Sequence, residues 1–599
     1  MRSLFDSILF INAIPNKFKI IYLSRRCVFR AGLVIGLLGP LTTFAQHKKE
    51  QLVSGQASHI LPTADTVSTT IPDQAKQVTE DSHASEKLAN KFYIQEIILE
   101  GAKFLNKRTR KRLIAPYLNT YLDAKKIRKL VRTIRAYYIE RGYPTTQVKV
   151  VLGQNLKEGV LKLMVSIGFI EEIIFNDHKR RDRGKIAMAF PWFRNRRLYL
   201  PYLEQGIDQI NSVPSSHATL RILPGLREGG SVIQIDHATN KPIRFDIGGD
   251  NMGKKNTGKW RWKYHLSIDN LFRVNDSWAL YYDTNHAKEV SGKKLRDHSL
   301  MAKLSFPLGY FNLSTTHSMR SCTQAVGKHQ GLYKAKSTTH NYEIKFPIYK
   351  YRISKGTVSL QLDHLITDNH IDDVPISVQN IEQTQLKIET HHTGLIFVGQ
   401  YVLKFEYGQQ LPWLRKAEKQ NPQVAKDEKP TFRQKLGAVD YQLSWMRPFS
   451  VWKKLLSYKF ECLGLYALNG HEVGFNPASS KYVRGFEDAK DCDSHHGICF
   501  KQELSFHHLF SFARWLFPLE LQTGIEMGYA HQLQHRDVKS PRLSAMLMSL
   551  VGGFHYDIKW LSLDFTYAKP LYASKHLAIP TNTYQILFSF NLKLHGLLP

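Results

Sequence analysis

The sequence predicts an all-β transmembrane barrel of about 16 antiparallel strands, preceded by two small α+β domains. Three observations predict it: residues 242–599 alternate apolar and polar side chains, residues 92–240 repeat one order of elements twice, and residues 1–45 are laid out like a secretory signal. A chain of 599 residues is too long for one ordinary core, so several domains or one large closed structure is expected.

The N-terminal segment predicts export. Residues 17–30, KFKIIYLSRRCVFR, are basic, and the apolar run AGLVIGLLGPLTTFA follows at 31–45 with small residues at Thr43 and Ala45. This order indicates a signal peptide over residues 1–45. Pro40 and the short run favour cleavage over a retained anchor, and no other stretch approaches the ~18 uninterrupted apolar residues of a membrane helix.

Residues 46–91 contain no Phe, Trp or Tyr and are rich in Gln, Ser, Thr and Ala. Such a segment buries too little apolar surface to offset its ordering entropy, so we interpret it as a flexible arm with room for one short helix.

Two small domains are predicted at residues 92–168 and 169–240. The first reads as the strand FYIQEIILEGA, the helices NKRTRKRLIAPYLN and DAKKIRKLVRTIRAYYIERGY, and the strands TTQVKVVL and GVLKLMVSI. A shorter variant of this order follows from Ile170, which indicates a tandem repeat of about 75 residues.

The charge balance is strongly basic, with 83 Lys and Arg against 51 Asp and Glu, a formal charge of +32. The basic residues are spread along the chain without a Lys-rich tail, which disfavours nucleic acid as a partner. Residues 91–240 hold 27 Lys or Arg against 13 Asp or Glu, hence +14. This basic region is either a solvated face or a docking surface for an acidic or polar extended chain.

The segments after residue 242 show period-two alternation, as in WRWKYHLSI, VSLQLDHL, WLSLDFTY and YQILFSFNLKL. A soluble sandwich also alternates, but an apolar face this aromatic over so many strands favours a membrane barrel at 242–599. We expect YQILFSFNLKL to be the last strand, with HGLLP outside it.

One polar loop, KYVRGFED at 481–488, and one later segment, LELQTGIEMGYA, are chemically notable. Period two places Ile525 on one face of that strand and Gly524, Glu526 and Gly528 on the other, which would point into the lumen. Glycine beside the acid would leave room for a loop to press against the wall.

Together these features resemble the outer-membrane transporters of two-partner secretion, the haemolysin and filamentous-haemagglutinin secretion and activation proteins, whose repeats are polypeptide-transport-associated (POTRA) domains. In that family the Arg of the VRGF loop, here Val483, Arg484, Gly485 and Phe486, folds into the lumen and pairs with an acid in a Gly-x-Asp-x-Gly strand. This chain offers Glu526 between Gly524 and Gly528, so the acid is one methylene longer. The alternative interpretation of Arg484 is an ordinary solvated loop residue.

The resemblance implies a monomeric pore in the bacterial outer membrane, with the repeats in the periplasm, that secretes and thereby activates a large exoprotein such as a haemolysin or adhesin. Family relatives carry a plug helix where residues 46–91 stand. The alternative is an outer-membrane assembly or insertion factor of the same superfamily, but two repeats fit secretion better.

Cys492, His495, His496 and Cys499 have spacing that zinc could use, but exported proteins meet an oxidising compartment, which favours a Cys492–Cys499 disulfide over zinc; free thiols remain the other alternative. No hydrolase elbow, zinc-protease motif, phosphate loop or dinucleotide fingerprint is present. We therefore expect no enzyme activity, no cofactor and no metal.

Overall fold

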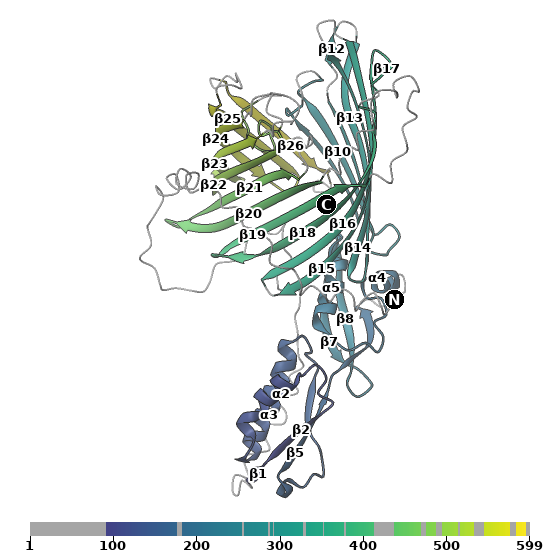
Figure 1. Cartoon of the computed structure of the whole chain (residues 1–599), viewed down its shortest axis with the longest axis vertical. Coiled ribbons are helices and arrows are strands. Elements are labelled where there is room, and N and C mark those ends of the chain that lie inside the picture. Colours follow the sequence, from purple (N-terminus) through teal and green to yellow (C-terminus); the bar gives the residue numbers. More distant parts are fainter. Residues whose placement is uncertain are drawn as a thin grey trace, which may run out of the picture. The chain divides into compact units, whose positions relative to one another are not determined.

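The computed structural model contains a closed β-barrel and two small α+β domains that precede it in the chain (Figure 1). It describes residues 91–594 except 177–181, 254–256, 286–287, 291–292, 327–330, 352, 377–378, 412–436, 469–474, 487–493, 513–514, 532–543 and 575–582. The predicted signal peptide and nearly all of the predicted arm lie outside the described residues. Within the described part of the chain, no helix has both the length and the apolar composition required to cross a membrane.

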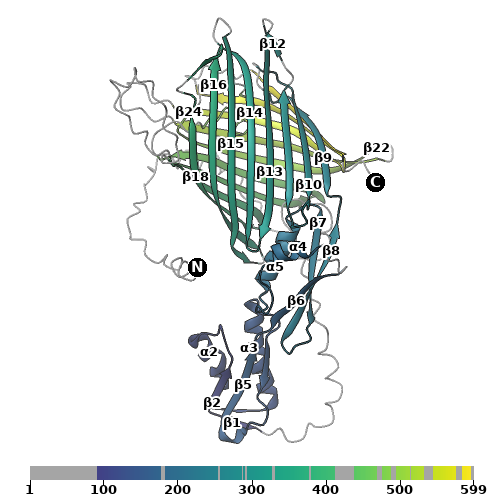
Figure 2. The same cartoon turned by 90° about the vertical axis from the view of Figure 1, so that its right-hand side faces the viewer.

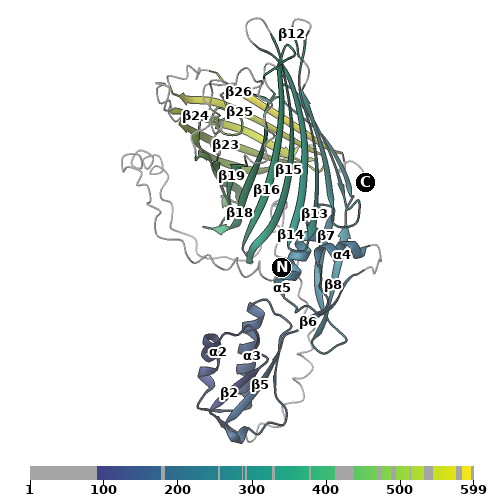
Figure 3. The same ribbon diagram turned by 45° about the vertical axis from the view of Figure 1, so that its right-hand side comes forward.

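The first small domain packs two helices on a three-stranded sheet of order β2-β5-β4, with a separate β1–β3 ribbon (Figure 3). Its elements are β1 (Phe92–Ile94), β2 (Glu96–Glu100), α2 (Lys107–Ile114), η3 (Ala115–Tyr117), β3 (Thr120–Leu122), α3 (Ala124–Glu140), β4 (Gln147–Val150), η4 (Leu156–Glu158) and β5 (Val160–Ser166). The helix expected over 106–119 ends early, because Pro116 has no N–H to continue the α-helical hydrogen bonds.

Helix α3 shows how the sequence specifies this core. Asp123 caps its N-terminus by accepting a 2.6 Å hydrogen bond from the Lys126 N–H, and this bond lowers the pKa of the Asp123 carboxyl. Leu130, Ile134 and Tyr138 recur at intervals of four residues and are fully buried. Burial raises the pKa of Tyr138 to about 12, and its hydroxyl donates a 2.7 Å hydrogen bond to a main-chain carbonyl.

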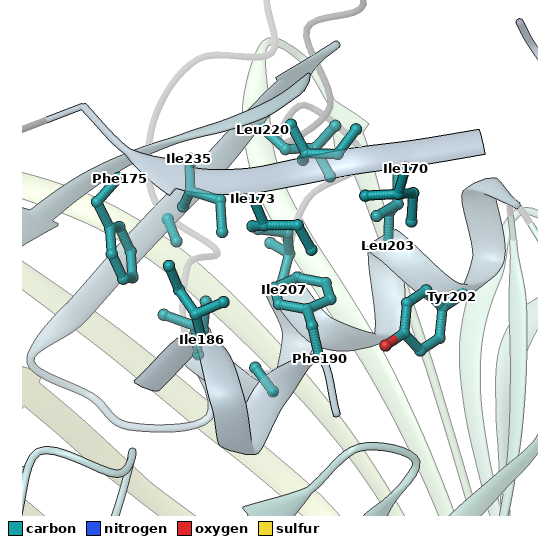
Figure 4. Close-up of a cluster of buried hydrophobic side chains, with 14 of the residues drawn as sticks. Ile170, Ile173, Phe175, Ile186, Phe190, Tyr202, Leu203, Ile207, Leu220 and Ile235 are labelled. Carbon is teal, nitrogen blue, oxygen red and sulfur yellow. The ribbon is translucent and has the colours of Figure 1, made fainter. Parts of the chain in front are cut away.

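The second small domain has the sheet order β6-β8-β7, with one helix pair against it. Its elements are β6 (Phe169–Phe175), α4 (Arg183–Ala189), α5 (Leu200–Asn211), β7 (Ser216–Pro224) and β8 (Gly230–Thr239). Figure 4 shows aliphatic side chains of the strands, such as Ile173 and Ile235, facing Ile186, Phe190 and Ile207 from the helical side. Parallel pairing of β6 with β8 repeats the parallel pairing of β2 with β5 in the first domain.

The barrel is closed by sixteen long antiparallel strands in the described residues, as predicted. The barrel sheet contains the eighteen strands β9 to β26, of which β12 and β17 are short extensions of three and two residues. The strands are β9 (Ile243–Asp250), β10 (Arg261–Asp269), β11 (Ser277–Asn285), β12 (Lys288–Val290), β13 (Lys293–Leu308), β14 (Phe311–Val326), β15 (Gly331–Tyr351), β16 (Ser354–Ile371), β17 (Val374–Pro375), β18 (Glu382–Ile396), β19 (Gly399–Gln410), β20 (Gly437–Val451), β21 (Lys454–Ala467), β22 (His496–Phe512), β23 (Trp515–His531), β24 (Ser544–Asp557), β25 (Leu561–Ala573) and β26 (Gln585–Lys593). β26 pairs with β9 from Ser589↔Asp250 to Lys593↔Asp246 and closes the barrel.

Strands β14 and β15 show how apolar residues on the outer face alternate with polar residues on the inner face. Met319 on β14 and Tyr342 on β15 are 49% and 54% exposed on the outer face. Arg320, the neighbour of Met319, points inward and makes two hydrogen bonds to Asp297 on β13. We call the end where β9 begins the near end, because β8 leads into it, and the opposite end the far end.

Candidate functional site

Strand β23 places one acid on the lumen wall. Ile525 and Tyr529 are 40% and 45% exposed on the outer face, whereas Glu526 is 1% exposed on the inner face. Alternation along a β-strand produces this contrast, as the sequence predicts. Residues 475–486, between β21 and β22, lie against this inner face, and Arg484 covers Glu526.

Arg484 and Glu526 form an ion pair across this contact. Arg484 Nε donates to Glu526 Oε1 at 2.7 Å, and its Nη2 lies 2.6 Å from the same oxygen. The main-chain N–H of Arg484 donates to Glu526 Oε2 at 2.6 Å. One carboxylate oxygen of Glu526 therefore binds the Arg484 side chain, and the other binds the Arg484 backbone.

Two further charges stand near the pair. Lys501, the register partner of Glu526 on β22, has its Nζ 3.9 Å from Glu526 Oε1, and Glu503 Oε2 lies 3.9 Å from Arg484 Nη2. The four charges sum to zero. The Glu526 and Arg484 side chains are only 2% and 20% exposed, and the void beside them has a volume of about 10 Å³, at the lower limit for one water. The ion pair is therefore largely desolvated.

Apolar contacts hold the loop on both sides of Arg484. Val483 and Phe486 are 0% and 3% exposed and belong to a buried cluster with Phe475, Cys499 and Leu547. The loop thus combines one ion pair with a small core of its own.

Glycines in the wall make room for this loop. A Cβ at Gly528 would lie 2.7 Å from Val483 Cγ2, and a Cβ at Gly497 would lie 1.9 Å from the Phe475 ring. Gly524 differs from the expectation that it also leaves room for the loop. Its missing Cβ would meet the Gln502 carbonyl of the neighbouring strand at 2.4 Å, so Gly524 relieves a contact within the sheet.

Gly485 connects the loop to the last strand. Its φ of +98° suits glycine, and its N–H donates a 2.8 Å hydrogen bond to Gln585 Oε1 on β26. Gln585, Phe475 and Gly497 were not among the site residues predicted from the sequence. Gly497 follows the His495-His496 pair, and a glycine at the start of a predicted strand could have signalled a close approach.

The cysteine and histidine cluster does not form a site in the described residues. Cys492 lies outside them, and Cys499 is a free, buried thiol whose Sγ donates a 3.3 Å hydrogen bond to the Tyr482 carbonyl. The free Cys499 thiol contradicts the expected Cys492–Cys499 disulfide and agrees with the alternative of free thiols. No group of three or more His, Cys, Asp or Glu side chains in the described ranges is arranged to hold a metal.

Comparison with known proteins places this geometry in a family. Residues 229–555, more than half of the chain, match the model of the haemolysin secretion/activation proteins ShlB/FhaC/HecB. The chain belongs to this family. Residues 92–168 match the ShlB-type POTRA domain, and residues 169–224 match another POTRA domain model.

Relatives of this haemolysin secretion/activation protein cover much of the chain. The outer membrane transporter CdiB of Dickeya dadantii is 24% identical over 486 residues, 80% of this chain and 83% of the relative. The hemolysin transporter protein ShlB of Serratia marcescens is 28% identical over 296 residues, 49% of this chain and 51% of the relative. The solved structure of CdiB from Escherichia coli has the same fold, with a TM-score of 0.71, 22% identity and coverage of 85% of this chain and 92% of that chain.

Proposed function

We propose that this chain is an outer-membrane transporter that exports one large partner polypeptide through its lumen, with residues 475–486 acting as the gate. The observation that carries this proposal is the loop on the lumen wall, held by a desolvated Arg484–Glu526 pair. Membership of the haemolysin secretion/activation family supports it, as do relatives named outer membrane or hemolysin transporters.

The POTRA domains would bind the N-terminal secretion domain of the partner in the periplasm. Strand β2 is at an edge of its sheet and pairs only with β5 in the described residues, so its other side can accept an added strand. The excess of 27 basic over 13 acidic residues between 91 and 240 favours an acidic or polar extended segment.

Translocation in this proposal needs no enzyme activity, cofactor or nucleic acid. A single chain closes the barrel, which supports a monomeric pore in the outer-membrane lipid. Folding of the partner outside the cell would make its return unfavourable and give export its direction. The alternative of a barrel-assembly factor is disfavoured, because the matching family model is that of secretion/activation proteins.

Deletion of residues 92–168 tests the proposal. We expect the barrel to insert, because these residues form a domain with its own core, while the partner disappears from the culture medium. Insertion is measured by heat-modifiable mobility on gels. Normal partner secretion by an inserted deletion variant would contradict the docking role.

A further inference from the structure

The outer face of the barrel carries a group of cations near its far end. Figure 2 shows β13, β14, β15 and β16 side by side in this wall. Arg296 on β13 pairs in register with Thr323 on β14, and Thr323 pairs with Lys334 on β15. One row nearer the near end, Ser321 pairs with Lys336.

The direction of these side chains follows from their neighbours. Arg320 lies between Ser321 and Met319 in the chain and points inward to Asp297. Alternation therefore turns Ser321, and with it Thr323, to the outer face that Met319 occupies. Residues directly paired across antiparallel strands share a face, so Arg296, Lys334 and Lys336 point outward as well.

Two of these cations make no ion pair within the part of the chain that the structure describes. Lys334 Nζ lies 2.6 Å from Asp373 Oδ1, but Arg296 and Lys336 are exposed and have no ion-pair partner among the described residues. The register partner of Lys336 on β16 is Asp368, but Asp368 Oδ1 lies 3.5 Å from His370 Nδ1 and forms no ion pair with Lys336. The hydroxyl side chains of Ser321 and Thr323 stand on the strand between the two free cations.

An apolar surface continues from this group toward the near end. Ile344 and Tyr342 on β15 and Leu360 on β16 are 43%, 54% and 41% exposed. Ile348 and Lys336 are twelve residues apart on β15, about 41 Å along a strand and about 29 Å in height at a tilt near 45°. Because the apolar band of such barrels is about 25 Å tall, Lys336 stands just beyond its far boundary.

We propose that this group, Arg296, Ser321, Thr323 and Lys336, binds a phosphate of lipopolysaccharide in the outer leaflet. The POTRA domains lie in the periplasm, and the last of them leads directly into the near end of the barrel. The far end therefore faces the outer leaflet. Guanidinium, ammonium and hydroxyl groups are the donors that phosphate accepts, and the apolar surface below them accommodates acyl chains. This arrangement of a cationic rim over an apolar surface complements an amphiphile with an anionic head, and it is independent of the gate in the lumen.

Lipid retention by the full-length protein tests the site. The R296S/K336S variant is purified from outer membranes in mild detergent, and bound lipopolysaccharide is counted by native mass spectrometry. The matched control, K303S/K345S, removes two lysines from the inner face of the same strands. We expect about thirtyfold weaker lipopolysaccharide binding for R296S/K336S, since a basic residue near an anionic lipid surface contributes about fivefold, and no change for the control. Equal retention by both variants, or equal loss from both, would overturn the proposal.

A second measurement covers failure of R296S/K336S to fold, which heat-modifiable mobility would reveal. Wild-type protein is then titrated with lipid A and with fully dephosphorylated lipid A. We expect preference for the phosphorylated lipid, which the charge-conserving R296K/K336R variant keeps. Equal binding of the two lipids would show that phosphate is not recognised. If R296S/K336S folds and loses partner secretion while its lipid binding is unchanged, the surface belongs to the exported chain and the lipid site is refuted.

Discussion

The Arg484–Glu526 pair gives the sharpest test of the gate. Arg484→Ala removes the guanidinium but leaves the main-chain N–H that donates to Glu526, whereas Glu526→Gln removes the negative charge and leaves one amide oxygen as acceptor. We expect both variants to insert a folded barrel, because neither residue is needed for strand pairing, and to reduce secretion of the partner because the loop loses its anchor.

The magnitude follows from the desolvation of the site. Removing one member of a buried pair costs about 3 to 5 kcal/mol. In Arg484→Ala, Lys501 Nζ remains 3.9 Å from the Glu526 carboxylate, and in Glu526→Gln, the Glu503 carboxylate remains 3.9 Å from the Arg484 guanidinium. Because each remaining charge keeps an opposite charge nearby, we expect a cost of about 3 kcal/mol. A change of about 3 kcal/mol shifts the ratio of docked to released loop by more than a hundredfold. The double variant should be little worse than either single one, since the two residues act as one unit.

Partner protein in the medium is the assay, with conductance in planar bilayers as a direct readout of loop release. Glu526→Asp should be mild, because the acid is retained and only its reach is shortened. Arg320→Ala is the matched control: it breaks an arginine–aspartate pair on the lumen wall that does not involve the loop. Normal secretion by both single variants, or defects that simply add, would refute the anchoring role.

Three further outcomes are expected. Gly528→Val should displace the loop and impair secretion at a cost of about 1 to 3 kcal/mol, because even its Cβ would lie 2.7 Å from Val483, whereas Gly552→Ala should be tolerated because its nearest atom is 3.9 Å away. Gln585→Ala should weaken the gate by about 1 kcal/mol through loss of the bond to Gly485, seen as a small rise in conductance. Truncation after Leu594 should leave insertion intact by heat-modifiable mobility, because β26 ends at Lys593; loss of the barrel from the membrane would contradict this.

The sequence predicts the barrel and the face of Glu526 because both depend on local alternation. Contacts that depend on closure of the whole barrel could not be predicted. Gln585 reaches Gly485 across 100 residues of chain, and no local pattern distinguishes Gln585 from other polar residues on the inner face. The role expected of Gly524 was wrong in part for a similar reason, since the position of the neighbouring Gln502 carbonyl depends on strand register.

An ion pair suits this gate for a physical reason. Replacing a buried pair by apolar groups of similar shape is often neutral or stabilising, so stability alone does not account for Arg484 and Glu526. Burial of Val483 and Phe486 contributes roughly 1.5 to 3 kcal/mol each and resists release, because those side chains lose favourable burial when water enters. Charged groups instead regain their hydration when the lumen becomes wet, so the ion pair fixes the docked geometry without adding much to the cost of undocking. A loop that must make way for a passing polypeptide therefore combines a small apolar core with an anchor that water can replace.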